Sequence, residues 1–345
     1  MLAALLTSLG VPSAAIGQRI ETPKGIYSRD DVPSGEYGLL QYVRHLANQQ
    51  PLQVVAIEVY SAALAKGLHH LVNYDYIAFT NITDDHLNVH GSMQAYEQAK
   101  ARLLNRLCEK GNMFVHPNPI GLTGILEQAG NQGIKVNQVK PCQTPFTLLF
   151  QQQNCALAKA LAQHILKLPT FAHLPAISEA LLHSKVMKLY SPPGRCERWE
   201  LPNGVTVFID FAHNSGGITT VIEHAKASLP VQAKVGFLLS SKGGWGRDKR
   251  MLMANAAAAA DIVIVTDDDP RTEDPAVIRM QLAYTHRYSQ ITPRSHAIST
   301  LCARLQAGDI AIIAGRGADD RWQDAAGRFR YNDIDVIKAM GGQKH

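Results

Sequence analysis

The second half of the chain contains four short apolar runs, and their regular spacing is the strongest constraint on the fold. The runs cover residues 205–209, 235–239, 261–265 and 309–314, with amphipathic helical patterns between them. Apolar runs that alternate with helical stretches are typical of parallel strands in an α/β protein. We therefore predict an α/β fold with a Rossmann-like parallel sheet in this half of the chain.

Each of these runs ends in a polar or glycine-rich segment. The four segments are Asp210-Phe211-Ala212-His213, Ser240-Ser241-Lys242-Gly243, Asp267-Asp268-Asp269-Pro270-Arg271 and Gly315-Arg316-Gly317. One such segment alone would fit an ordinary surface turn. The carboxyl ends of parallel strands meet along one edge of a sheet, where ligands bind in open α/β folds. Four polar ends together therefore indicate a ligand crevice.

In the first half, residues 76–79 are apolar and aromatic and are predicted to form a strand. The polar residues of the loop that follows are Asn81, Asp84, Asp85, His86 and His90. Ser92 is a suitable N-cap for a helix that we predict to run to about Gly111. Lys100 lies on the apolar side of this helix. Because an isolated buried cation is costly, its amine either reaches water along an apolar stem or has a function beside the loop.

The segment Thr80-Asn81-Ile82-Thr83-Asp84-Asp85-His86-Leu87-Asn88-Val89-His90-Gly91, followed by Ala99-Lys100, resembles the central domain of the Mur ligases. The resemblance is closest to the branch that adds the third residue to UDP-N-acetylmuramoyl-dipeptide. Those enzymes join an amino acid to a nucleotide-linked peptide with ATP, through an acyl phosphate. Glu58-Val59-Tyr60-Ser61, at the end of a strand predicted at 53–59, resembles a second motif of the same domain.

The resemblance implies a magnesium site that takes part in catalysis. Lys100 would be carbamylated, and Lys100, His86 and Glu58 would hold Mg²⁺. Magnesium prefers oxygen ligands, which a carbamate supplies and an amine does not. The spacing of His86 and His90 alone would also suit zinc, although no further histidine or cysteine pair supports that alternative.

Four residues resemble nucleotide-binding positions of the family: Asn154, Arg195, Asp210 and His213. Asn154 would open a helix at 154–166 and contact adenine, with a helix cap as the plain alternative. Arg195 would reach ATP through a forked, charged contact. Asp210 and His213 belong to a segment that resembles D-Y-A-H, which borders the nucleotide in the family.

Five residues resemble positions that bind the incoming amino acid: Arg247, Asp268, Arg271, Gly315 and Asp319. The D-D-D-P-R stretch at 267–271 is close to D-D-N-P-R, whose arginine holds a carboxylate of diaminopimelate in related enzymes. Arg271 therefore implies a dicarboxylic or zwitterionic amino acid. Asp269 replaces the asparagine, and Asp319 ends a Gly-Arg-Gly-Ala-Asp segment in place of G-K-G-H-E. These departures leave the identity of the amino acid open.

Ser191-Pro192-Pro193-Gly194 is the best candidate domain boundary, because two prolines and a glycine separate patterned regions. We predict a central ATP- and magnesium-binding domain at 1–191 and a C-terminal Rossmann-like domain at 192–345. The phosphate-cradling G-x-x-x-x-G-K-(S/T) motif does not occur in the sequence. The resemblance begins at Met1, so we expect either an incomplete ligase, without its first domain, or a degenerate paralogue.

The composition fits a globular enzyme of the cytoplasm. A chain of 345 residues with 46% hydrophobic and 18% charged residues suffices for two domains with their own cores. The net charge of +5 contains no basic block of the kind that binds nucleic acid, and no apolar run is long enough to cross a bilayer. Five scattered cysteines fit reduced thiols in the cytosol.

We therefore predict an ATP-dependent amide ligase that adds an amino acid, of the diaminopimelate type, to a UDP-N-acetylmuramoyl peptide in peptidoglycan precursor synthesis. Two alternatives remain. One is a non-catalytic pseudo-ligase that keeps the fold as a binding subunit. The other is a Mur-like ligase with a different acceptor, as in folylpolyglutamate or cyanophycin synthesis.

Overall fold

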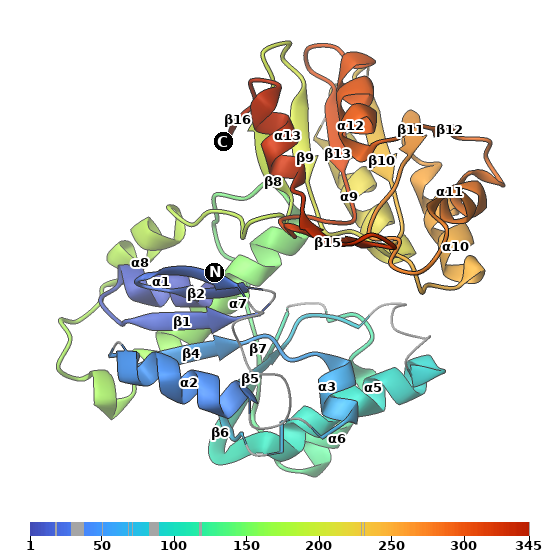
Figure 1. Ribbon diagram of the computed structural model, residues 1–345. Coiled ribbons are helices and arrows are strands. Elements are labelled where there is room, and N and C mark those ends of the chain that lie inside the picture. Colours follow the sequence, from blue (N-terminus) through green and yellow to red (C-terminus); the bar gives the residue numbers. More distant parts are fainter. Residues whose placement is uncertain are drawn as a thin grey trace. The chain divides into compact units, whose positions relative to one another are not determined.

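The computed structural model describes residues 1–17, 19–28, 38–49, 51–67, 69–70, 72–82, 90–116, 119–228, 230 and 232–344. The chain divides into two compact units, Met1–Tyr190 (unit 1) and Ser191–His345 (unit 2), which are described separately (Figure 1).

Unit 1 contains two small sheets and the helices that cover them. Its elements are α1 (Leu2–Ser8), β1 (Ser13–Ile16), β2 (Arg19–Thr22), β3 (Gly25–Ser28), α2 (Gly38–Gln49), β4 (Val54–Ile57), α3 (Ser61–Ala65), β5 (Tyr74–Phe79), α5 (Met93–Ala101), β6 (Leu107–Val115), α6 (Thr123–Asn131), β7 (Val136–Gln138), α7 (Leu149–Ile165) and α8 (Glu179–Val186). The strands are ordered β3-β2-β1-β4 in one sheet and β5-β6-β7 in the other. The pair β1–β4 and all of β5–β7 are parallel.

Helix α7 is buried on two sides and ties unit 1 together. On one side Cys155, Ala162 and Ile165 pack with Leu5 and Leu6 of α1. On the other side its alanines and leucines pack on Phe114 of β6. The opposite face of β5–β7 is covered by a separate apolar cluster that includes residues of α5 and α6. The sheet β5–β7 is therefore enclosed between helical layers.

Two predicted elements of unit 1 have different bounds in the structure. Ser92 caps α5, as predicted, but the helix ends at Ala101 and a 3₁₀ turn leads into β6, so the prediction of a helix to Gly111 was wrong. The buried run Met113 to Val115 forms a central strand instead, and Gly111 is a poor helix former. Helix α7 begins at Leu149, so the prediction that Asn154 opens this helix was also wrong.

Unit 2 is built on one mixed sheet. Its elements are β8 (Glu197–Glu200), β9 (Thr206–Ile209), α9 (Ser215–Ala227), β10 (Val235–Leu239), α10 (Arg247–Ala257), β11 (Ile262–Val265), α11 (Pro275–Ala283), β12 (Ser289–Gln290), α12 (Arg294–Ala303), β13 (Ile310–Ile313), β14 (Arg321–Asp324), β15 (Gly327–Arg330), α13 (Asp333–Ala339) and β16 (Gln343–Lys344). The sheet order is β12-β11-β10-β13-β9-β8-β16, and β14 and β15 form a separate hairpin.

The five strands from β12 to β9 are parallel, which confirms the predicted α/β class and the Rossmann-like second half. Strands β8 and β16 extend one edge in the antiparallel sense, a feature that the apolar pattern did not predict. All residues of β10 and β13 are buried, because these strands lie in the middle of the sheet. The loops after β10, β11 and β13 therefore meet at one edge.

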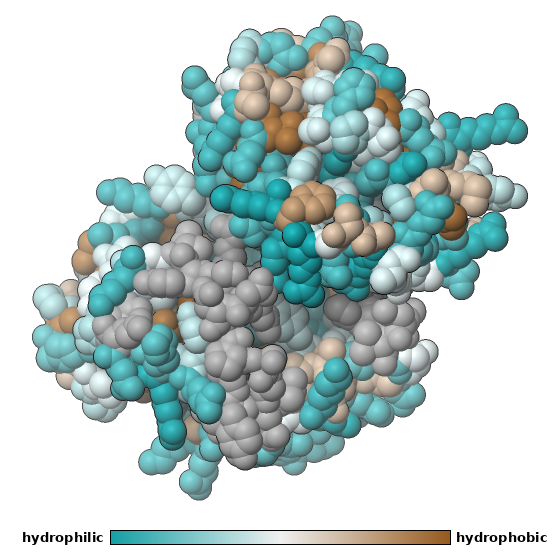
Figure 2. All heavy atoms as spheres, viewed as in Figure 1, coloured by the Kyte–Doolittle hydropathy of each residue, from teal (hydrophilic) through white to brown (hydrophobic). Residues whose placement is uncertain are grey.

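No helix in the described ranges is long and apolar enough to cross a membrane. On the face drawn in Figure 2, hydrophobic side chains are scattered in small groups among hydrophilic ones. Isolated exposed hydrophobic side chains of this kind are normal on globular proteins.

Candidate functional site

The ends of β10, β11 and β13 gather charged side chains at one edge of the unit 2 sheet. The acidic ones are Asp268, Asp269 and Asp319. Asp268 is buried, and its Oδ1 accepts a hydrogen bond from Arg316 Nη1 at 2.6 Å. Burial opposes its ionisation, but the positive charges of Arg316 and Arg294 outweigh burial and hold the pKa of Asp268 below its ordinary value. This carboxylate therefore stays charged inside the protein.

Lys242 bridges the other two carboxylates. Its Nζ lies 3.3 Å from Asp269 Oδ2 and 3.2 Å from Asp319 Oδ2, and the three side chains are only 18%, 11% and 13% exposed. The Arg321 backbone N–H and Nε also donate to Asp319, at 3.1 and 3.2 Å. Burial works against the charge of Asp319, but Lys242 and Arg321 keep its pKa below the ordinary value. Lys242 was not among the predicted site residues, and its place after a strand was the only signal in the sequence.

Two buried arginines hold the loops of this edge in place, and neither was predicted. The Nε and Nη2 atoms of Arg294 each donate to the Asp333 carboxylate at 2.8 Å. Arg294 Nη1 donates to Ser240 Oγ at 2.9 Å, which anchors the end of β10. Arg250 makes a similar forked contact with Glu273, at 2.5 and 2.7 Å. Forked arginine–carboxylate contacts fix direction as well as distance, so the loops are held in one arrangement.

Arg271 has an exposed side chain and an unusual backbone conformation. Its φ of +56° is uncommon for a residue other than glycine, and its N–H donates to Gln323 O at 3.0 Å. The side chain is exposed, and its guanidinium has no hydrogen-bonded partner within the described part of the chain. Residues held in such conformations cluster at ligand sites. The position predicted to hold a carboxylate therefore has an available cation.

Gly315 and Arg247 lie at the same edge of the unit 2 sheet, after β13 and at the start of α10. Gly315 has φ +102°, and a Cβ there would lie 2.9 Å from Ser240 Oγ and 3.1 Å from Asp268 Oδ2. Glycine is therefore needed for the end of β13 to approach its neighbours. Arg247, the first residue of α10, is exposed and lies 5.4 Å over the Tyr284 ring.

Asp210 organises the turn at the end of β9. Its Oδ2 accepts from the Cys196 N–H and its Oδ1 from the Ala212 N–H, both at 2.7 Å. His213 Nδ1 lies 2.7 Å from a backbone carbonyl, and its ring lies 5.4 Å from that of Trp245. The structure therefore gives the Asp210 carboxylate a clear role in holding the turn.

Arg195 lies beside this turn, with its guanidinium 4.7 Å over the Phe211 ring. The preceding Gly194 has φ +68°, and a Cβ there would lie 2.1 Å from the Ala318 nitrogen. No other residue type fits this approach without a backbone shift. The Gly194 turn is therefore packed directly against the segment that follows β13.

In unit 1, Glu58 follows β4 at the end of the parallel pair β1–β4. Its N–H donates to Ile16 O at 2.7 Å, and its Oε2 accepts from the Tyr60 hydroxyl at 3.1 Å. A Cβ on Gly17 would lie 2.6 Å from that same Oε2. The glycine thus makes room for a carboxylate that keeps acceptor capacity for a cation.

Lys100 lies on α5, half-buried, with its Nζ 5.3 Å over the Tyr96 ring. The His90 ring stacks on the same tyrosine at 5.3 Å, and His90 Nε2 lies 3.0 Å from Ser61 Oγ. Lys100 and His90 therefore both lie against Tyr96, and His90 also contacts Ser61, which follows Glu58 by three residues. His86, the third predicted metal ligand, lies outside the described residues.

These residues fit magnesium in part. Glu58 supplies the oxygen atoms that Mg²⁺ prefers. Lys100 fits only as a carbamate, because an ammonium has no lone pair to donate. In the ranges that the structure describes, no group of three or more His, Cys, Asp and Glu side chains is arranged to hold a metal.

Asn154 lies in the second turn of α7, where its Oδ1 is 3.1 Å from His116 Nε2. Because Oδ1 only accepts, Nε2 carries the hydrogen and the Asn154 amide NH₂ points elsewhere. Burial lowers the pKa of His116, which keeps its ring neutral, and the hydrogen bond to Asn154 only partly offsets that effect. His116 was not predicted, although it directly follows β6.

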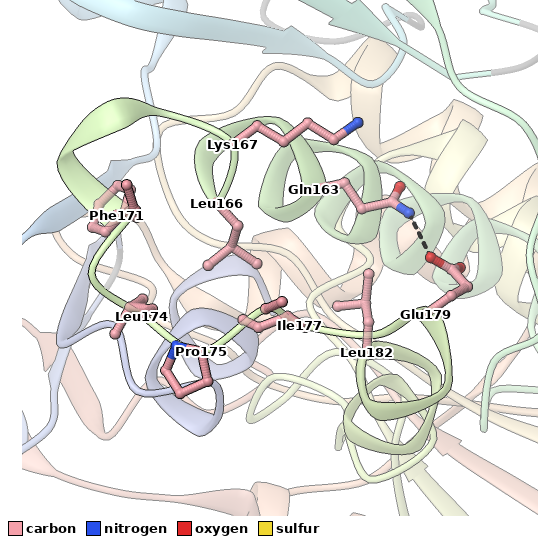
Figure 3. Close-up of a pocket in the computed structure, with 11 residues that line it drawn as sticks. Gln163, Leu166, Lys167, Phe171, Leu174, Pro175, Ile177, Glu179 and Leu182 are labelled. Carbon is pink, nitrogen blue, oxygen red and sulfur yellow. Dashed lines mark hydrogen bonds between the residues drawn. The ribbon is translucent and has the colours of Figure 1, made fainter.

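A separate pocket of about 460 Å³ lies near the C-terminal end of α7 (Figure 3). It is lined by apolar side chains such as Leu166, Phe171 and Ile177, and Gln163 donates to Glu179 at 3.0 Å on its rim. None of the predicted site residues lines this pocket. We therefore do not assign it to the chemistry of the site.

Comparison with known proteins identifies the family. The profile of the Mur ligase middle domain matches residues 1–143, and that of the Mur ligase, glutamate ligase domain matches residues 194–317. A UDP-N-acetylmuramoyl-L-alanyl-D-glutamate–2,6-diaminopimelate ligase of Caulobacter vibrioides is 30% identical over 99% of this chain and 74% of its own length. The chain belongs to the Mur ligase family. This confirms the family predicted from the sequence, whose members are ATP-dependent amide ligases.

Two further proteins are similar to this Mur ligase chain, one in sequence and one in fold. UDP-N-acetylmuramyl-tripeptide synthetase 2 of Oceanobacillus iheyensis is 29% identical over 91% of this chain and 69% of its own length. The chain therefore spans about two thirds to three quarters of these two relatives. The Mycobacterium tuberculosis folylpolyglutamate synthase complexed with ADP and AMPPCP shares the fold, with a TM-score of 0.67 at 18% identity over 91% of this chain and 84% of that one.

Proposed function

We propose that this chain carries the ATP-binding and amino-acid-binding parts of a ligase that extends a UDP-N-acetylmuramoyl peptide by one amino acid. The charged edge of the unit 2 sheet supports this proposal, because an available arginine, Arg271, lies there in the same loop as the buried acids Asp268 and Asp269. The names of the two curated relatives, a tripeptide synthetase and a diaminopimelate ligase, support the muramoyl peptide as acceptor.

We also propose that the reaction takes place in the cytoplasm. All five cysteines are free thiols, as expected for a reducing compartment.

In the proposed reaction a carboxylate of the muramoyl peptide attacks the γ-phosphate of ATP, the bond to the β-phosphate breaks, and an acyl phosphate and ADP form. Asn154 would hold the adenine edge with its amide NH₂, since its Oδ1 is occupied by His116. Arg195, rigidified on the Phe211 ring, would contact the nucleotide. Asp210 and His213 would border it, with Asp210 acting chiefly by fixing the turn. Most of the rate gain would come from positioning and charge stabilisation.

The amine of the incoming amino acid then displaces phosphate from the acyl phosphate. Arg271, helped by Arg247, would hold a carboxylate of that amino acid, and Gly315 and Asp319 would line the part of the site that receives its side chain. Lys242 lies against Asp319, so a cationic group in this part of the site is disfavoured.

Mg²⁺, held by Glu58, His86 and carbamylated Lys100, would neutralise phosphate oxygens when bound. Within the protein, Gly17 leaves space for the Glu58 carboxylate, and the Lys100 Nζ lies 5.3 Å over the Tyr96 ring. Conversion of Lys100 to a carbamate would replace its contact with the ring by oxygen ligands.

Substitution of Lys100 tests this part of the proposal. K100A should abolish turnover while thermal unfolding stays close to the unmodified protein, because Lys100 is only half-buried. Added formate, a small carboxylate, should restore part of the activity if the lysine acts as a carbamate. K110A, an exposed lysine of β6, is the matched control and should leave turnover unchanged. Activity of K100A equal to that of the control would rule out the metal-site assignment.

The overall function is tested by phosphate release from ATP. Release should require both a UDP-N-acetylmuramoyl dipeptide and an amino acid. Tight nucleotide binding without release under any combination would favour the pseudo-ligase alternative. Release that depends on a folate and glutamate, and not on the muramoyl peptide, would favour the folylpolyglutamate type.

A further inference from the structure

The carboxylates at the edge of the unit 2 sheet already have partners within the protein itself. Asp269 Oδ1 accepts from the Gln323 N–H at 2.9 Å, and its Oδ2 faces Lys242 at 3.3 Å. Asp319 Oδ1 accepts from Arg321, and its Oδ2 faces Lys242 at 3.2 Å. Asp268 accepts from Arg316 at 2.6 Å and from Ser240 at 3.5 Å. Each oxygen of the three acids therefore has a donor within the chain.

Lys242 occupies the place that a substrate ammonium would need. Its Nζ sits between Asp269 and Asp319 in a setting where all three side chains are less than one fifth exposed. A second ammonium at the same oxygens would lie close to Nζ, and repulsion between like charges is strong where water is scarce. A cationic group on the side chain of the amino acid is therefore disfavoured here.

The same edge does offer a place for an anion. Arg271 is exposed, its backbone is held at φ +56°, and its guanidinium has no hydrogen-bonded partner among the described residues. The ammonium of Lys242 has three N–H donors; one donates to Asp319, and the ammonium also forms an ion pair with Asp269. The third is available to an oxygen of a ligand. The available donors therefore suit a carboxylate.

We propose that Lys242 determines specificity in the amino-acid site, so that the site takes a monoamino acid with a side-chain carboxylate and rejects a diamino acid. This inference rests on the proposed ligase function and narrows its substrate class. Lys242 acts through the charge that it places between Asp269 and Asp319. The aspartates that depart from the family pattern are then partners of the lysine, and not ligands for a second amine.

The test compares kcat/KM for glutamate and 2-aminoadipate with kcat/KM for lysine and diaminopimelate. K242M removes the charge at similar length, and K242R keeps it. K226M is the matched control, because Lys226 is an exposed lysine of α9 that pairs with Asp261 at 3.6 Å. The unmodified protein should prefer the two monoamino acids, glutamate and 2-aminoadipate. K242M should lower the glutamate-to-lysine ratio by roughly tenfold or more, equivalent to one lost charge contact, while K242R and K226M leave it unchanged.

A second measurement separates this inference from the ligase proposal. Equilibrium dialysis of radiolabelled glutamate and lysine against the full chain with ADP reports binding without any ligation. Preference for glutamate that K242M loses would support the inference even if no product forms. Preference for lysine or diaminopimelate in the unmodified protein, an unchanged ratio in K242M, or no binding of either amino acid would overturn it. The ranking by the unmodified protein decides the matter even where K242M does not fold.

Discussion

Replacement of Asp333 by asparagine should destabilise unit 2 strongly. Asp333 has no exposed surface and Arg294 is 2% exposed. Both carboxylate oxygens of Asp333 accept from Arg294 at 2.8 Å. In D333N the side chain keeps its shape, but one oxygen becomes an NH₂ group that points at a guanidinium. Arg294 is then left buried with only part of its charge compensated.

The magnitude follows from the burial of this pair. Removing one partner of a buried, hydrogen-bonded ion pair costs about 3–5 kcal/mol. With a urea dependence of roughly 2 kcal/mol per M, the unfolding midpoint should fall by about 1.5–2.5 M. The matched control is R330Q, because Arg330 and Asp320 form a pair at 3.8 Å with side chains 77% and 54% exposed. Exposed pairs of this kind contribute about 0–1 kcal/mol, so the control midpoint should move little.

Tryptophan fluorescence during urea unfolding is the assay, because Trp199, Trp245 and Trp322 all lie in unit 2. The signal therefore reports this unit and not the whole chain. If D333N unfolded within about 1 kcal/mol of the unmodified protein, well below the range for a buried pair, the Arg294–Asp333 pair would not stabilise unit 2 as a buried ion pair.

Two further predictions concern the loops of unit 2. G194A should destabilise the protein by more than about 1 kcal/mol, because alanine at φ > 0 is strained and its Cβ would lie 2.1 Å from the Ala318 nitrogen. The matched control is G246A, where a Cβ meets no atom within 4 Å. Equal denaturation midpoints for the two variants would contradict this prediction. Hydrogen bonding from Arg250 holds the pKa of Glu273 below its ordinary value. The ionised Glu273 side chain therefore stabilises the folded protein fully above the unfolded pKa of about 4.3. This stabilisation is lost as pH falls through the folded pKa. The difference in melting temperature between the unmodified protein and E273Q should therefore be constant from about pH 6 to 8 and shrink below about pH 4; a difference that grows on acidification would count against it.

The predicted strands of unit 2 were found because their signal is local. Residues 235–239 form a continuous apolar run, and the central strand β10 is buried along its whole length. The charged edge of the sheet was predictable for the same reason, since polar residues such as Asp268 directly follow these runs. The ends of the strands therefore predicted where charged side chains gather without any knowledge of their contacts.

The contacts that shape the site were not predictable, because they join residues far apart in the sequence. Arg294 meets Ser240 and Asp333 across long stretches of chain, and Lys242 reaches Asp319 in the same way. A buried arginine looks like a surface arginine in the sequence. The wrong end predicted for helix α5 has another cause. The leucines after Lys100 suit a longer helix and a 3₁₀ turn before a strand equally well. Only the pairing between β5 and β6 decides between them.

In the proposed ligase reaction a substrate carboxylate is activated by phosphate transfer and then attacked by an amine. The most direct measurement uses a UDP-N-acetylmuramoyl dipeptide labelled with ¹⁸O in its terminal carboxylate, together with ATP and glutamate. We expect a ligated product by mass spectrometry and one ¹⁸O atom in each phosphate released. Phosphate that carries no ¹⁸O, or hydrolysis of ATP without a ligated product, would contradict it.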